Sequence, residues 1–105
     1  NSTIGIIKIG NSIPNSFTLY QNYPNPFNPA TKIRLEIPAW SDNNHLLRLI
    51  IYDILGNEAA ILVNDQLTPG SYETTWDASG FASGIYFYRI ETERFVDTKR
   101  MIFLK

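Results

Sequence analysis

Three of the six prolines of the chain fall within nine residues, at positions 23–31. Each proline fixes its own φ and pushes the residue before it out of the helical region. Asn25 and Asn28 each precede a proline, and their side chains can bond the neighbouring backbone in Asx turns. This segment therefore forms neither a helix nor a central strand. We predict a stiff connector that Tyr23 and Phe27 pin to the domain, with the strands on either side laid out around it.

The segment that follows the prolines has a period-two pattern of apolar residues. Ile33, Leu35 and Ile37 alternate with charged side chains, so one face of this strand is expected to be buried and the other to lie in water. Residues 46–52 are almost continuously apolar, which predicts a central strand covered on both faces. Further strands are expected at residues 17–20, 58–63, 71–76, 85–90 and 95–104, with turns at 53–57, 64–70 and 77–84 and a hairpin tip at 93–94.

These segments define the fold class. None of them shows an apolar stripe with a period of ~3.6 residues over the length of a helix. The strands recur about every ten residues with turn residues between them, which is typical of an antiparallel β-sandwich. A chain of 105 residues is long enough to close one core. We predict a single all-β domain, an antiparallel β-sandwich of about seven strands.

The first part of the chain carries weaker signals. Four isoleucines between positions 4 and 9 favour a short strand, whereas Gly5 and Gly10 weaken it. A strand at the domain edge and a tail from a preceding domain fit these residues equally well. We expect residues 1–16 to be a lead-in and residues 17–105 to be the domain proper.

The composition narrows the classes of partner. A net charge of −1 gives no basic field to hold nucleic acid. We therefore expect no nucleic-acid binding. No apolar run approaches the ~18 residues that a membrane helix requires, so we expect no membrane insertion either. The absence of cysteine removes disulfides, thiolate metal ligands and cysteine nucleophiles. No signal peptide is visible, so the chain is either cytosolic or one domain of a longer exported protein.

Catalytic chemistry has few candidates in this sequence. His45 is the only histidine and stands beside two asparagines in a polar stretch, which favours a solvated loop residue. No serine lies in a Gly-x-Ser-x-Gly elbow. We therefore expect no catalytic residue and no enzymatic activity.

Two aspartates and one tryptophan have alternative interpretations. Asp53 and Asp77 each follow a strand directly and precede a glycine by three residues, which favours side chains that accept backbone N–H bonds at turns. The alternative is a calcium site built from loop carboxylates, but no Asp-x-Asp-x-Asp spacing supports it, so we expect no metal and no cofactor. Trp40 lies in a polar loop and either packs at the rim of the core or offers a ring to a carbohydrate.

Basic residues gather at the end of the chain. Five of the nine lie in the last seventeen positions, namely Arg89, Arg94, Lys99, Arg100 and Lys105. One interpretation is a final strand whose charged ends discourage edge aggregation. The other is a short extended segment that a receptor reads by strand addition and charge. The residues alone leave both interpretations open.

A set of motifs links these segments to a known family. The motifs are YPNPFNP at 23–29, YDILG at 52–56, LV at 62–63, GSY at 70–72, WDA at 76–78, ASGIYFYR at 82–89 and TKRM at 98–101. In this order and spacing they resemble the type A C-terminal sorting domain of the bacterial type IX secretion system. The resemblance extends over residues 17–105.

The resemblance implies an immunoglobulin-like sandwich at the C-terminus of a larger exported protein. In that family the outer-membrane translocon recognises the domain after the cargo, covalently linked upstream, has reached the periplasm. A surface sortase then removes the domain, and the cargo is attached to lipopolysaccharide or released. The recognition determinants carried over by the motifs are Pro24, Asn25, Pro26, Gly70, Tyr72, Lys99, Arg100, Met101, Ile102, Phe103, Leu104 and Lys105.

Two features depart from the family pattern. The loop at residues 38–46, which contains Trp40, is longer than the usual connection, and residues 1–16 match no motif. An immunoglobulin-like repeat associated with flagellar hook-capping proteins shares much of the signature, but it usually carries an extra charged turn where this chain has only residues 78–82. The alternative function is a noncatalytic carbohydrate-binding or adhesion module that uses Trp40 and surface tyrosines.

Overall fold

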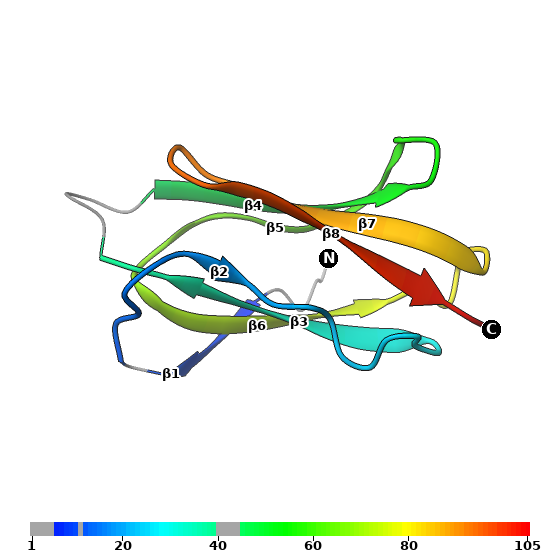
Figure 1. The fold of residues 1–105 in the computed structure, drawn as a ribbon, viewed down its shortest axis with the longest axis horizontal. Coiled ribbons are helices and arrows are strands. Elements are labelled where there is room, and N and C mark those ends of the chain that lie inside the picture. The colour runs from blue at the N-terminus through cyan, green and yellow to red at the C-terminus, as the bar shows by residue number, and fades with distance from the viewer. Residues whose placement is uncertain (1–5, 11, 40–44) are drawn as a thin grey trace.

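The computed structural model describes residues 6–10, 12–39 and 45–105. These residues form eight strands in two antiparallel four-stranded sheets that pack face to face (Figure 1). We term them sheet A, with the strand order β1-β6-β3-β2, and sheet B, with the order β5-β4-β7-β8. The strands are β1 (Ile6–Gly10), β2 (Thr18–Leu19), β3 (Ala30–Ile37), β4 (His45–Asp53), β5 (Glu58–Leu67), β6 (Gly70–Asp77), β7 (Gly84–Glu91) and β8 (Val96–Phe103). The prediction of an all-β sandwich is confirmed.

The core lies between the two sheets and follows the period-two pattern of the sequence. In β3, Ile33, Leu35 and Ile37 are fully buried, as predicted. Across the core, the rings of Trp76 and Tyr86 meet edge to face with centroids 5.2 Å apart. Other side chains with no exposed surface are those of Leu47, Leu49, Ile51, Ala78, Tyr88, Ile90, Met101 and Phe103.

The prediction that β4 is covered on both faces is wrong. On its outer face Leu46 is 47% exposed and Arg48 is half-buried, and of the outward-facing residues described there only Ile50 is buried. Among the described residues there are only these two sheets, so no third layer covers the outer face of sheet B. Ile50 instead lies between its cross-strand neighbours Ile61 and Arg89.

The predicted turn at residues 64–70 is also wrong, because β5 continues to Leu67 and only residues 68–69 link it to β6. Residues 64–66 pair with residues 46–48 of β4 while their polar side chains point into solvent. An edge strand needs a backbone partner on one side only, so a polar sequence does not prevent it from pairing. Trp40 and residues 41–44 of the predicted loop lie outside the described residues, and the expectation that His45 is a loop residue is wrong, because β4 begins there.

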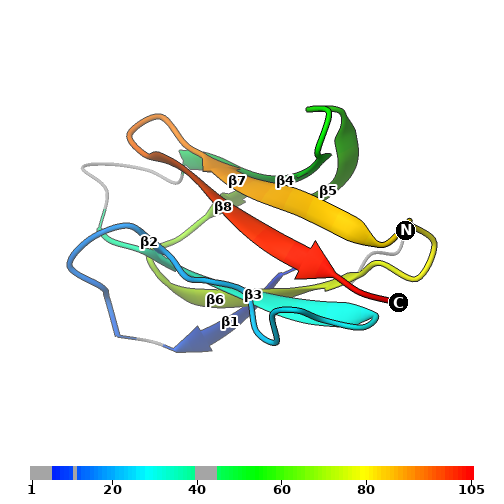
Figure 2. The same cartoon turned by 45° about the vertical axis from the view of Figure 1, so that its right-hand side comes forward.

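Two segments complete the architecture. Strand β1 pairs with β6 at the edge of sheet A, with a register shift between Lys8 and Gly10; whether it joins a preceding domain stays a prediction. Residues 20–29, termed the β2–β3 connector, cross from sheet A to the edge of sheet B beside β8 (Figure 2). Its three X–Pro peptide bonds are cis.

Candidate functional site

The β2–β3 connector occupies the outer edge of the last strand. The N–H of Phe27 donates to the carbonyl of Ile102 at 3.0 Å, and the N–H of Leu104 donates to the carbonyl of Phe27 at 3.1 Å. The Asn25 side-chain oxygen accepts the N–H of Ile102 at 2.9 Å. Further along, the Gln21 amide donates to the carbonyl of Arg100 at 2.7 Å. The connector thus covers the part of the β8 edge that would otherwise be exposed from Arg100 onward.

Buried polar groups hold the first half of the connector in place. Asn22 is only 2% exposed, and its backbone N–H donates to the Tyr88 hydroxyl at 2.8 Å. That hydroxyl donates to the carbonyl of Tyr20 at 2.7 Å. The Asn22 amide donates to the Thr31 hydroxyl at 2.9 Å and to the carbonyl of Pro24 at 3.1 Å. Burial raises the pKa of Tyr88 above its ordinary value, so this hydroxyl stays protonated and can donate.

An aromatic ring holds the second half of the connector. Phe27 is 2% exposed, and its ring stacks on Phe103 at 5.2 Å and lies tilted against Trp76 at 5.9 Å. Tyr23 behaves differently, because its backbone pairs with Lys32 while its side chain is 80% exposed. The expectation that both rings pin the connector therefore holds for Phe27 alone.

The connector and the chain end together form one exposed surface. Pro24, Asn25 and Pro26 are exposed and lie beside the end of β8 through the Asn25 bond to Ile102. On the strand side, Arg100 and Lys105 are exposed, Ile102 and Lys99 are half-buried, and Leu104 is 52% exposed. We term the exposed residues together with the half-buried Ile102 the connector–tail surface: Pro24, Asn25, Pro26, Arg100, Ile102, Leu104 and Lys105. Met101 and Phe103 are absent from it because their side chains are fully buried.

Gly70 and Tyr72 lie apart from this surface. Gly70 pairs with Ile37, whereas the connector joins the other end of β3 at Ala30. A Cβ on Gly70 would approach the Lys8 Cε to 2.6 Å, and the φ of +150° further restricts this position to glycine. Tyr72 is 5% exposed, and its hydroxyl donates to the carbonyl of Thr68 at 2.7 Å. Both residues shape the turn between β5 and β6.

The sequence patterns did not indicate which polar residues hold the connector in place. Gln21, Asn22 and Thr31 are polar residues beside a proline-rich segment, and such residues look the same in a sequence whether they are solvated or buried. Tyr88 lies in the strand predicted at residues 85–90, but nothing in the sequence indicates where its hydroxyl bonds. The partner of each polar group depends on contacts far apart in the sequence.

Asp53 and Asp77 act as turn residues in the structure. The Asp53 carboxylate accepts the N–H groups of Leu55 and Asn57, each at 2.9 Å, and the bond from Asn57 is the main cause of its lowered pKa. The Asp77 carboxylate accepts the hydroxyl of Ser79 and, at 2.9 Å, its N–H, and these two bonds lower the pKa of Asp77. In the described part of the chain, no three histidine or acidic side chains cluster as metal ligands would.

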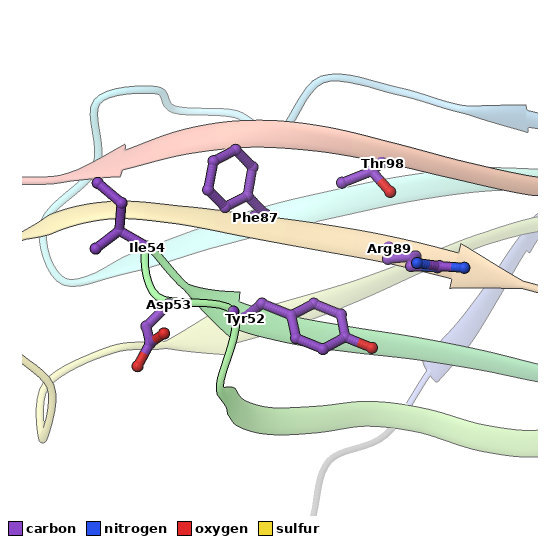
Figure 3. A pocket seen from close by; sticks show the side chains of 7 residues that line it. Tyr52, Asp53, Ile54, Phe87, Arg89 and Thr98 are labelled. Carbon is purple, nitrogen blue, oxygen red and sulfur yellow. The ribbon is translucent and has the colours of Figure 1, made fainter.

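A shallow hollow of about 330 Å³ lies on the outer face of sheet B (Figure 3). Its walls include the rings of Tyr52 and Phe87, and Arg89 and Thr98 border it from β7 and β8. The Asp53 side chain points away from Phe87 and Arg89 (Figure 3). The hollow therefore offers apolar surface and one cation, without an acid–base pair aimed into it.

Comparisons with known proteins place the connector and β8 in a single family match. The family model described as "Secretion system C-terminal sorting domain" matches residues 21–104. The match begins within the β2–β3 connector and ends one residue beyond β8. No curated protein and no solved structure matches the chain. Within the described residues no helix is long and apolar enough to cross a membrane.

Proposed function

Because this chain belongs to the family of type IX secretion C-terminal sorting domains, we propose that it directs an attached cargo protein across the outer membrane through the type IX translocon. A type IX sorting tail is a signal attached to a cargo and recognised by the secretion machinery, and it implies export to the cell surface or outside the cell. The domains of this family are generally non-catalytic. In this proposal the cargo passes through the periplasm and a surface sortase removes the domain afterwards.

The observation that supports the proposal most directly is the joining of two distant motifs. The prolines at positions 24 and 26 and the basic residues Arg100 and Lys105 are separated by more than seventy positions, yet the bond between Asn25 and Ile102 brings their segments together. The Tyr88 hydroxyl accepts the N–H of Asn22 and donates to the carbonyl of Tyr20, and we term these two hydrogen bonds the Tyr88 clamp. Because the Tyr88 clamp fixes the connector, the connector–tail surface is preorganised. A preorganised surface loses less conformational entropy when a receptor binds it.

The remaining family determinants take a structural role in this proposal. Met101 and Phe103 are fully buried, and Tyr72 is nearly so. Gly70 is buried at the β5–β6 turn. A receptor that binds the folded domain cannot reach these buried residues, and we propose that they maintain the shape of the domain. Lys99 is half-buried and contributes charge at the margin of the surface.

The test is an export assay with residues 1–105 fused to the C-terminus of a periplasmic reporter, in a bacterium that has the type IX system. Deleting residues 99–105 would remove two buried core residues, so charge substitutions give a cleaner answer. The variant Arg100→Gln with Lys105→Gln removes two exposed charges from the connector–tail surface. We expect the surface-exposed reporter to fall at least about tenfold, the loss that corresponds to ~1.4 kcal/mol of binding.

The matched control is Lys8→Gln with Lys32→Gln, which removes the same charge from sheet A. Both double variants should keep the thermal unfolding midpoint of the parent fusion, because all four side chains are on the outside of the domain. If the parent fusion stays in the periplasm, the proposed function is wrong. If the parent is exported and both double variants are exported equally well, the assignment of the surface is wrong. Sortase removal predicts that surface reporter migrates at the mass of the reporter alone.

A further inference from the structure

The backbone groups of β8 alternate between its neighbour β7 and the outer edge of sheet B. Both the N–H and the carbonyl of Ile102 bond to the connector, so the backbone of this residue points away from β7. The β7–β8 register runs without a shift from Phe103 to Val96. Because backbone direction alternates along a strand, the N–H and carbonyl groups of Val96, Thr98 and Arg100 also point to the outer edge.

The connector covers only the second half of that edge. It bonds the carbonyl of Arg100, both groups of Ile102 and the N–H of Leu104. In the first half, the N–H of Thr98 bonds only to the carboxylate of the adjacent Asp97, at 2.9 Å. The carbonyl of Thr98 and the N–H of Arg100 have no hydrogen-bond partner within residues 6–10, 12–39 and 45–105. Residues 96–100 are therefore an open stretch of edge, which we term the open β8 edge.

The opposite edge of the same sheet is protected in a way that the open β8 edge is not. The pairing of β5 with β4 contains two register shifts, whereas polar or charged residues lie on both edges, at 64–66 of β5 and at 97–100 of β8. Bulges are a device by which proteins discourage the addition of a further strand. The open β8 edge has an unshifted register, and Val96 is 54% exposed there. It is thus the better template for a partner strand.

The charge beside this edge indicates the kind of strand that would pair. Arg100 forms no ion pair with any described residue, and its neighbour on the same face, Arg89, bonds Glu91 at 3.1 Å. Glu91 also accepts Arg48 at 3.2 Å, so one carboxylate serves two guanidinium groups. The outer face next to the open β8 edge therefore carries an excess of positive charge, which a carboxylate on the partner would complement.

We propose that the open β8 edge is a strand-addition site at which an extended, acidic segment of the translocon pairs with residues 96–100. The inference rests on the proposed function and specifies how the translocon binds the domain. The occupant is a polypeptide because the unpaired groups are backbone donors and acceptors, which a strand satisfies in register. The connector ends the available edge at the Arg100 carbonyl, so the added strand is short and its position along β8 is fixed.

The experiment removes one outward donor without touching the ladder to β7. Thr98→Pro deletes the N–H that points to the outer edge, and proline is tolerated at such edge positions. Thr98→Ala is the matched control, because it shortens the same side chain and keeps the N–H. Both are placed in the reporter fusion described above. We expect Thr98→Ala to be exported like the parent and Thr98→Pro to lose at least about tenfold of its surface reporter.

A folding readout keeps the test decisive. Circular dichroism and thermal unfolding of each purified fusion show whether the domain stays folded, and if Thr98→Pro unfolds, Val96→Pro replaces it, since the first residue of a strand also accepts proline. A folded proline variant that is exported at the parental level overturns the proposal, as does equal loss of export with Thr98→Ala. If the parent forms a dimer that the proline variant abolishes while export continues, the edge pairs with a second copy and the proposal is wrong. Failure of the parent to be exported would instead refute the proposed function.

Discussion

The first and last strands of this domain are both edge strands, yet they are built differently. Strand β1 has β6 as its strand partner, and its Ile7 and Ile9 are 59% and 41% exposed. Strand β8 buries Met101 and Phe103 completely and is held on its outer edge by the connector. The contrast indicates that the end of the chain is part of the core, whereas the strand at its beginning is an addition to one sheet.

The largest expected effect tests the claim that β8 belongs to the core. Phe103→Ala removes a fully buried ring that stacks on Phe27 at 5.2 Å. We expect the free energy of unfolding to fall by ~3–5 kcal/mol, the usual cost of truncating a buried aromatic residue. Urea denaturation followed by tryptophan fluorescence measures it. A loss below ~1 kcal/mol would mean that β8 is as dispensable as an ordinary edge strand.

Tyr88→Phe tests whether the hydrogen bonds of the Tyr88 hydroxyl contribute to the free energy of unfolding, as the packing of Phe103 does. The substitution keeps the ring but leaves the N–H of Asn22 and the carbonyl of Tyr20 without their partner. We expect a loss of ~1–3 kcal/mol, because an unsatisfied buried polar group retains its desolvation cost. Tyr86→Phe is the matched control, since it removes a single bond to the carbonyl of Ala82. Equal losses of unfolding free energy in the two variants would show that the Tyr88 hydrogen bonds contribute no more than the single bond of Tyr86.

Removing residues 1–10 tests the other side of the comparison. Of the described residues removed, only Ile6 packs against the core, and it is partly buried. We expect unfolding free energy to fall by about 1–2 kcal/mol, in proportion to that limited apolar burial. The same denaturation experiment gives the value. A loss as large as that of Phe103→Ala would remove the distinction between the two edge strands.

The sequence predicted the strands of this fold better than the contacts between them. The period-two pattern located β3, because alternate residues of a strand face the core and the solvent. The same logic failed for residues 64–66, where the backbone pairs while the side chains stay in water. The junction of Asn25 with Ile102 could not be predicted, because no local pattern records which side chain will meet a backbone group 77 positions away. The motif resemblance named both segments without indicating that they touch.

Asn25→Ala probes the link between connector and β8 with a smaller expected effect. The substitution removes the side-chain oxygen that accepts the N–H of Ile102 at an exposed site. We expect a loss of ~0.5–1.5 kcal/mol, the net value of one hydrogen bond. Amide hydrogen exchange sharpens the result, because the Ile102 amide should exchange faster while the amide of Met101, which faces β7, stays protected. Unchanged exchange at Ile102 would contradict the proposed sealing of this edge.

The smallest expected effect is on the pH dependence of stability. It distinguishes the Asp77 turn, which lies next to the connector, from the Asp53 turn. Because the pKa values of Asp53 and Asp77 are lowered, both carboxylates stabilise the folded state at pH values above the ordinary pKa of 3.8. This contribution is lost as the pH falls through the lowered pKa values. Asp77 leads into Ala78, whose N–H bonds the carbonyl of Pro29 at 2.8 Å, whereas the Asp53 carboxylate accepts N–H groups of its own turn. We therefore expect Asp77→Asn and Asp53→Asn each to reduce the decline in stability between pH 5 and pH 2. Only Asp77→Asn should also speed hydrogen exchange at Ala78, and acceleration of that amide in Asp53→Asn would show that the two turns are coupled through the core.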